Sequence, residues 1–143
     1  VGGNPMVIEY NVRMGDPETE VVIPRIESDI LDWFELMHQK RLNEAKVKFD
    51  PKTATTVMVV SGGYPGDYVK GNEISGVENV EDCLVFHAGT KTENGKLVTN
   101  GGRVMAFTAK GESKEKALQK SYSAVNKICF HGINYRKDIG FDL

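Results

Sequence analysis

The first candidate for chemistry is a short polar row near the start of the chain, made by Glu9, Asn11 and Arg13. These residues alternate with apolar ones from Met6 onward, and in a β-strand this period of two places them on one face, about 7 Å apart. A carboxylate and an amide oxygen are ligands that Mg²⁺ prefers, and a neighbouring arginine can bind phosphate through two hydrogen bonds. A strand over 6–13 would therefore present either a metal and phosphate site or the solvated face of an antiparallel sheet.

A second candidate is a pair of basic residues beside glycine-rich segments. Lys91 follows a turn-like stretch that contains Gly89, and Arg103 follows Gly101 and Gly102. If Lys96 to Thr99 forms one arm of a hairpin, the two cations approach each other at its open end. Two cations beside glycine-rich backbone suit an anion, although solvated charges at loop ends would give the same pattern.

The other polar features are less specific. The loop from Ser61 to Gly66 lacks the Gly-Lys-Ser/Thr ending of a phosphate-binding P-loop, so we expect its glycines to allow tight turns and close packing. Arg136 either pairs with Asp138 or contacts a substrate. The three histidines share no spacing that indicates zinc or a nucleophile–base pair.

The elements that must position these residues follow from hydrophobic periodicity and turn chemistry. Ser28 and Ser113 are expected to cap two amphipathic helices, which run to about Leu42 and about Cys129. The dipeptide Asn94-Gly95 predicts a hairpin turn. The expected strands of the second half are Thr55 to Val60, Leu84 to His87, Lys96 to Thr99 and Arg103 to Thr108.

This order of elements predicts an α+β fold. Strands followed by one covering helix, rather than alternating β-α-β units, favour a small antiparallel sheet with a C-terminal helix on one face. The polar stretch around Asp50-Pro51 indicates a junction, so we divide the chain into residues 1–50 and 51–143. The start of the chain runs straight into the strand pattern without a methionine, and we interpret it as part of a longer protein.

The amino-acid composition restricts the classes of molecule that the chain could bind. Eighteen basic and twenty acidic residues give a formal net charge of -2, so no global positive field would hold a nucleic acid. No apolar run approaches the roughly 18 residues that span a bilayer, and no signal peptide is recognisable. We expect a soluble, cytoplasmic protein in which Cys83 and Cys129 are buried, reduced thiols.

The segment from Glu9 to Val21, which reads EYNVRMGDPETEV, resembles the signature of the phosphoribosylamine-glycine ligases, also called glycinamide ribonucleotide synthetases. Met14 departs from the leucine or phenylalanine more usual there, which is a volume-conserving exchange. The resemblance spans nearly the whole chain and also covers the segments Ser61 to Gly66, Phe86 to Thr90, Thr99 to Val104 and Tyr135 to Gly140.

This resemblance implies a fold and a reaction. Residues 1–50 would contribute the terminal strand and helices of an ATP-grasp domain, and residues 51–143 would form the C-terminal α+β domain of the ligase. The family uses ATP to join glycine to 5-phosphoribosylamine in purine synthesis, through glycyl phosphate. This chain alone would lack most of the ATP site and the N-terminal domain of the same polypeptide, so we expect it to be inactive by itself.

The resemblance also implies roles for single residues. Glu9 and Asn11 would ligate the Mg²⁺ or Mn²⁺ that bridges the ATP phosphates, and Arg13 would contact the transferred phosphoryl group. Related ATP-grasp enzymes suggest that Asp16 holds the substrate amine, although Gly-Asp-Pro is equally a turn former. By the same comparison, Lys91 and Arg103 would hold the substrate phosphate.

Two readings compete with the ligase. A noncatalytic β module of the biotinyl- or lipoyl-carrying type would explain residues 55–143 equally well, but it would not need the segment 6–21. An RNA-binding domain is disfavoured by the negative charge and by the absence of an aromatic strand face.

Overall fold

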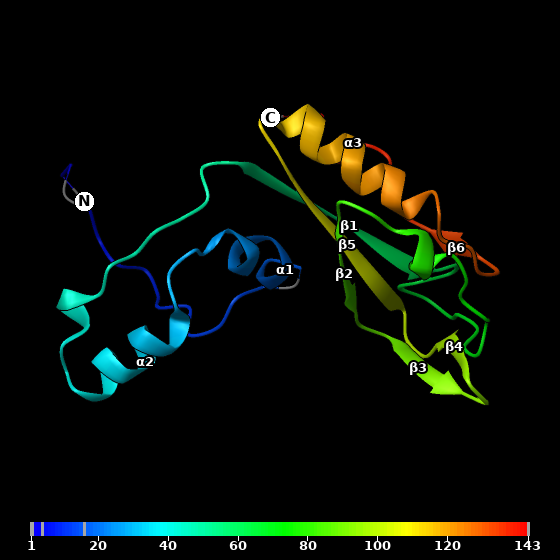
Figure 1. The fold of residues 1–143 in the computed structure, drawn as a ribbon, viewed down its shortest axis with the longest axis horizontal. Helices are drawn as coiled ribbons and strands as arrows, with labels where there is room; N and C mark the ends of the chain where they lie inside the picture. The colour runs from blue at the N-terminus through cyan, green and yellow to red at the C-terminus, as the bar shows by residue number, and fades with distance from the viewer. Residues whose placement is uncertain (1, 4, 16, 143) are drawn as a thin grey trace.

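The computed structural model describes residues 2–3, 5–15 and 17–142. It is an α+β fold, as the sequence predicts. Figure 1 shows α3 lying along the sheet, α2 at the opposite end of the molecule, and α1 between α2 and the sheet. The helices are α1 (Thr19–Val22), α2 (Ile30–His38) and α3 (Lys114–Val125), with short 3₁₀ turns η1 (Ile23–Arg25), η2 (Leu42–Glu44) and η3 (Val77–Asn79). The strands are β1 (Thr53–Ser61), β2 (Leu84–His87), β3 (Thr90–Glu93), β4 (Lys96–Thr99), β5 (Arg103–Gly111) and β6 (Ile133–Asn134).

The main sheet is antiparallel and has the strand order β2-β5-β1-β6. Its two long central strands are β1, rich in β-branched residues, and β5, most of whose residues are buried, while one face of β1 is only half-buried. The four strands expected in this half are confirmed, and β2 and β4 have the predicted bounds. The pair β3-β4 forms a separate hairpin, whose turn residues Asn94 and Gly95 both have positive φ, as an Asn-Gly turn requires.

Helix α3 covers one face of the main sheet, as predicted. Ser113 caps it by accepting a hydrogen bond from the N–H of Lys116. The side chains of Val57 and Val59 on β1 and of Phe107 on β5 are fully buried in the cluster beneath this helix. The helix ends at Val125, before the predicted Cys129.

Cys129 is exposed, so the expectation that it is buried is wrong. Its neighbours Ile128 and Phe130 are both buried in the core. In this extended stretch, alternate side chains point to opposite sides, and Cys129 therefore faces out. Cys83 is half-buried.

The strand expected over 6–13 is absent from the structure. These residues are extended and exposed, and none of them is paired with a described residue. Ile8 is 97% exposed, although it lies on what would be the apolar face. A strand is stable only when a neighbour accepts and donates its backbone hydrogen bonds, and no described strand pairs with these residues.

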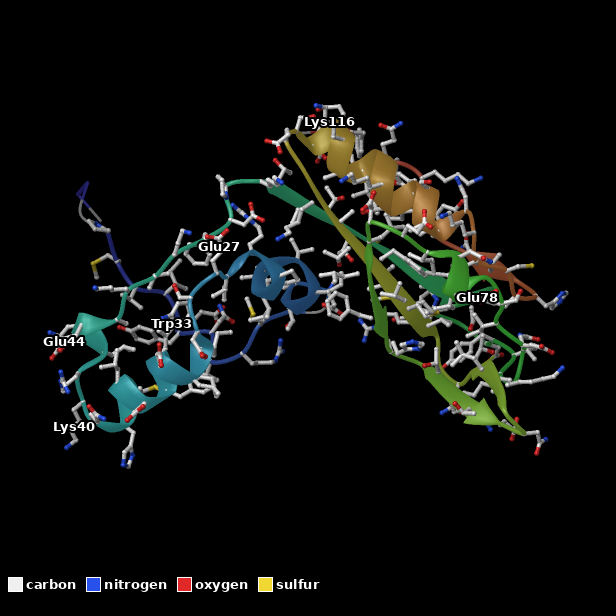
Figure 2. All side chains as sticks on the ribbon, in the orientation of Figure 1. Glu27, Trp33, Lys40, Glu44, Glu78 and Lys116 are labelled. Carbon is white, nitrogen blue, oxygen red and sulfur yellow. The ribbon has the colours of Figure 1, made fainter. Side chains whose placement is uncertain are left out.

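Helix α2 is shorter than predicted and has a different cap. It begins after Asp29, whose side chain accepts a hydrogen bond from the N–H of Leu31. Ser28 instead accepts from the N–H of Lys48, 2.7 Å away, and so ties the helix to the returning chain. Trp33 makes a second tie to this return segment through a hydrogen bond to the carbonyl of Lys46, and Figure 2 shows Trp33 between the two segments.

The N-terminal half is joined to the sheet by an ion pair at the start of β1. The ammonium of Lys110 on β5 lies 2.6 Å from the carboxylate of Asp50 and also donates to the carbonyl of Pro24. The backbone N–H of Asp50 in turn donates to the carbonyl of Arg25, and the guanidinium of Arg25 donates back to the carbonyl of Asp50. No helix in the described part of the chain is long and apolar enough to cross a membrane.

Candidate functional site

A cavity of about 620 Å³ lies against the face of the main sheet that α3 leaves uncovered. Thr56, Met58 and Val60 form its floor, because they alternate along β1 with the buried residues that face α3. Arg103 at the start of β5 and the segment that follows β6 complete the wall, and Pro17 contributes from the N-terminal half.

A β-bulge turns Arg103 toward this cavity. Along β1 and β5 the pairs run in step to Val59 opposite Met105, but the next residue, Val60, lies opposite Arg103 instead of Val104. Because side chains alternate between faces, this shift of one residue places Arg103 on the face of Val60 and leaves Val104 fully buried in the core.

Glycines allow the close packing that fixes the backbone on both sides of Arg103. A Cβ on Gly102 would lie 2.1 Å from the ring of Tyr64, another residue that lines the cavity. A Cβ on Gly89 would lie 2.6 Å from the Cα of Gly101. The expectation of close backbone packing also holds in the loop after β1, where a Cβ on Gly62 would lie 2.7 Å from the carbonyl oxygen of Gly132.

Arg136 also lines the cavity and is held in place from two sides. Its Nε and Nη2 donate to the two carboxylate oxygens of Asp138 at 2.9 and 3.1 Å, and its carbonyl accepts from the hydroxyl of Tyr122 at 2.9 Å. The hydrogen bond from Arg136 lowers the pKa of Asp138, and the same bond raises the pKa of Arg136. The sequence left open pairing with Asp138 or contact with a substrate, and the pairing is confirmed.

Glu9 and Asn11 lie next to each other although they are not on a strand. The Nδ2 of Asn11 is 3.4 Å from Oε1 of Glu9, and Arg13 donates to the carbonyl of Met14. The two side chains fit a Mg²⁺ ion that is held by one or two protein oxygens and completed by water and phosphates, once the amide of Asn11 presents its oxygen. The part of the chain that the structure describes contains no larger group of His, Cys, Asp and Glu that could hold a metal.

Asp16 lies outside the described residues. Its neighbours form a turn in which the N–H of Gly15 donates to the carboxylate of Glu18, just before α1. Pro17 lines the cavity that contains Arg103.

Lys91 is not among the described residues that line the cavity. Its ammonium lies 3.0 Å from the carboxylate of Glu93 on the exposed hairpin. Gly89, two residues before Lys91, donates its N–H to the carbonyl of Arg103 at 2.8 Å. The structure thus places Arg103 and Arg136 at the cavity, and Lys91 is not among the described residues there.

Sequence reasoning missed Tyr64 and Tyr122 as parts of this site. Tyr64 sits in a glycine-rich loop, where an isolated aromatic residue gives no periodic signal. Tyr122 lies on α3, and its hydroxyl reaches Arg136 only because the C-terminal segment returns beside that helix. The packing of this segment beside the helix is a tertiary contact, which local sequence patterns do not indicate.

The comparisons with known proteins agree on one family. Residues 54–142 match the model of the family described as phosphoribosylglycinamide synthetase, C domain. A phosphoribosylamine-glycine ligase of Caldanaerobacter subterraneus is 44% identical over 135 residues, which are 94% of this chain and 32% of the relative. That of Pseudomonas aeruginosa is 45% identical over 141 residues, which are 97% of this chain and 33% of the relative.

A solved structure agrees as well. The crystal structure of phosphoribosylamine-glycine ligase from Thermotoga maritima superposes with a TM-score of 0.72 at 39% identity, over 95% of this chain and 34% of that one. The chain thus spans about a third of the length of these relatives. The match favours the ligase family over a biotinyl- or lipoyl-carrying module. The chain belongs to the phosphoribosylglycinamide synthetase C-domain family.

Proposed function

We propose that this chain is the C-terminal third of an ATP-dependent ligase that joins glycine to 5-phosphoribosylamine and yields glycinamide ribonucleotide, ADP and phosphate. The observation that carries the proposal is the 44–45% identity to phosphoribosylamine-glycine ligases over 94–97% of the chain. The match extends beyond residues 54–142, and so includes part of the N-terminal region. In this proposal residues 1–50 complete an ATP-grasp domain, and the protein works in the cytoplasm.

Glu9 and Asn11 are the proposed residues that would hold the Mg²⁺ or Mn²⁺ that accompanies ATP. Their adjacency at 3.4 Å and their hard donor atoms support this role. Such an ion, when bound, neutralises charge on the transferred phosphoryl group. Arg13 would add a second positive charge beside the same oxygens.

The proposed reaction has two steps. An oxygen of the glycine carboxylate attacks the γ-phosphorus of ATP, and the bond to ADP breaks. The amine of phosphoribosylamine then attacks the carbonyl carbon of glycyl phosphate, phosphate leaves, and the nitrogen loses a proton. Asp16 is the proposed partner of this amine, where a carboxylate would orient the nucleophile and favour the loss of its proton.

Lys91 and Arg103 are the proposed ligands of the phosphate at the other end of phosphoribosylamine. The placement of Arg103 at the cavity, with Pro17 on another wall, supports a substrate that extends from the arginine toward residue 16. To bind the substrate phosphate, Lys91 would have to break its ion pair with Glu93. Exposed ion pairs are weak, so this exchange would cost little free energy.

Reconstitution of a complete ligase tests the proposal. We define the joined ligase as this chain fused to the part of the Thermotoga maritima ligase that it does not cover. The purified chain alone is expected to form no product, because positioning by the missing domains supplies most of the rate in phosphoryl transfer. The joined ligase is expected to make glycinamide ribonucleotide, with ATP, glycine and phosphoribosylamine all required.

The control is the Thermotoga maritima ligase with its own C-terminal third, assayed under the same conditions. A joined ligase that unfolds in one cooperative transition but forms no product would contradict the proposed function. Steady glycine-dependent ATP hydrolysis by the chain alone would show that the missing domains are not needed.

A further inference from the structure

We propose that Arg136 is a further ligand of the substrate phosphate at the cavity beside Arg103, and that Tyr122 is its positioning residue. The inference deepens the proposed function, and it rests on that function only for the identity of the natural substrate. Neither the sequence signature nor the family match assigns a role to Arg136 or Tyr122.

Charge is the first argument. Arg103 and Arg136 both line the cavity, and its described lining residues include no carboxylate, although Asp138, which does not line it, pairs with Arg136. The chain as a whole has a formal charge of -2, so two guanidinium groups at one cavity are a local feature. Two guanidinium groups at one cavity favour an anion that accepts several hydrogen bonds, such as phosphate.

The volume of the cavity and its other lining residues indicate a ligand larger than an inorganic anion. Its volume of about 620 Å³ lies within the range of about 300–1,000 Å³ that is usual for pockets binding small molecules. Thr56, Asn134 and two tyrosines offer groups that can hydrogen-bond to hydroxyls, and Met58 offers an apolar surface. Hydroxyl partners beside an apolar wall suit a sugar.

Arg136 is already oriented for binding. Asp138 engages its Nε and Nη2, while its Nη1 forms no hydrogen bond with the residues that the structure describes. Asp138 thereby fixes the plane of the guanidinium and leaves one nitrogen available to a ligand. An arginine fixed in this way loses less conformational entropy when it binds.

Tyr122 positions the backbone that carries Arg136. Its hydroxyl donates to the carbonyl of Arg136 at 2.9 Å and accepts from the N–H of Ile139 at 3.3 Å. The segment between these two contacts includes Asp138, so one hydroxyl fixes both ends of the loop that holds the arginine. The substitution Tyr122→Phe removes these two hydrogen bonds and keeps the ring that packs against Tyr135.

The direct test is a titration of the chain with ribose 5-phosphate, inorganic phosphate and ribose, followed by NMR of the arginine Nε–H groups. Ribose 5-phosphate is expected to shift the signals of Arg103 and Arg136 and to saturate. Inorganic phosphate should bind more weakly, and ribose alone should leave both signals unchanged.

Substitutions of single residues identify which side chains contribute to the binding of ribose 5-phosphate. Arg136→Ala should weaken ribose 5-phosphate binding at least tenfold, and Arg136→Lys should recover part of the loss because it keeps the charge without the planar fork. Tyr122→Phe should weaken binding severalfold while the Arg136 signal still responds, which a merely structural role would not produce. The matched control is Arg41→Ala, because Arg41 is also an exposed arginine paired with a carboxylate, that of Glu44.

In the joined ligase, Arg136→Ala should raise the KM for phosphoribosylamine and leave the KM for ATP unchanged. Ribose 5-phosphate binding that is equal in Arg136→Ala and Arg41→Ala, or no saturable binding by the unaltered chain, would overturn the inference. An active joined ligase with an unchanged KM in Arg136→Ala would overturn it and leave the proposed function intact. A folded but inactive joined ligase, with binding that still depends on Arg136, would overturn the function alone.

Discussion

Val60 of β1 lies opposite Arg103 of β5, one residue out of step with the pairs along the rest of the two strands. This bulge decides which face of the sheet carries the arginine. In a regular ladder Val104 would oppose Val60, and Arg103 would point toward the buried face under α3, where an unpaired charge is costly. The bulge thus exposes the arginine at the cavity and keeps the valine in the core.

The contact between Gly102 and Tyr64 leads to a stability prediction. Gly102→Ala should destabilise the chain by about 1–3 kcal/mol, because the new methyl group overlaps the tyrosine ring. In a Tyr64→Ala background the same substitution should cost less, since the ring is gone. Urea unfolding of the two single variants and the double variant measures this coupling, and strictly additive effects would contradict the described packing.

The ion pair between Asp50 and Lys110 leads to a pH prediction. The hydrogen bond from Lys110 is the largest cause that lowers the pKa of Asp50 below its ordinary value of 3.8. A carboxyl group with a lowered pKa in the folded state stabilises the fold above its ordinary pKa, and this contribution is lost as the pH falls through the folded value. The free energy of unfolding should therefore decrease between about pH 5 and pH 2.

Asp50→Asn tests this account. The variant should be less stable than the unaltered chain at pH 7 and should lose less stability on acidification, as measured by urea unfolding at several pH values. Lys110→Met should have a similar effect, and the exposed Lys116→Met serves as its control. A pH dependence that is identical in Asp50→Asn and the unaltered chain would assign the acid sensitivity to other groups.

The two cysteines should differ in reactivity. Burial raises the pKa of the Cys83 thiol to about 11, and its sulfur also donates a hydrogen bond to the carbonyl of Thr108. Since the thiolate is the reactive form, Cys83 should be alkylated much more slowly than the exposed Cys129 at pH 8. Mass spectrometry after timed iodoacetamide treatment measures both rates, and the difference should vanish in denaturant. Equal rates in the folded chain would contradict the burial of Cys83.

Much of the fold could be predicted because its signals are local. The Asn94-Gly95 turn and the β-branched strands β1 and β5 give clear short-range patterns. β3, which reads Thr-Lys-Thr-Glu, has no apolar face and was expected only as an unspecified arm of the hairpin. The pattern over 6–13 is typical of a strand, but the prediction is wrong for this structure, because a sequence pattern cannot supply the neighbouring strand that would pair with it.

The candidate site could be predicted only in part. The neighbouring glycines marked Arg103 as a candidate, and the structure places it at the cavity. Asn11 contacts Glu9, although the strand that was expected to align them is absent. The bulge that orients Arg103 leaves no periodic trace in the sequence. The position of Arg136 depends on a C-terminal segment that contacts α3 through the hydroxyl of Tyr122, a long-range contact that sequence periodicity does not indicate.

The most direct test of the account compares Glu9→Gln and Arg103→Ala in the joined ligase, with the KM of each substrate measured separately. Arg103→Ala should remove a charged hydrogen bond of about 1.5–3 kcal/mol and raise the KM for phosphoribosylamine roughly 10- to 150-fold, with the KM for ATP unchanged. Glu9→Gln should raise the Mg²⁺ concentration needed for activity and lower kcat, with little effect on phosphoribosylamine saturation. If Arg103→Ala instead weakens ATP binding and leaves phosphoribosylamine saturation unchanged, the assignment of the cavity to the phosphorylated substrate is wrong.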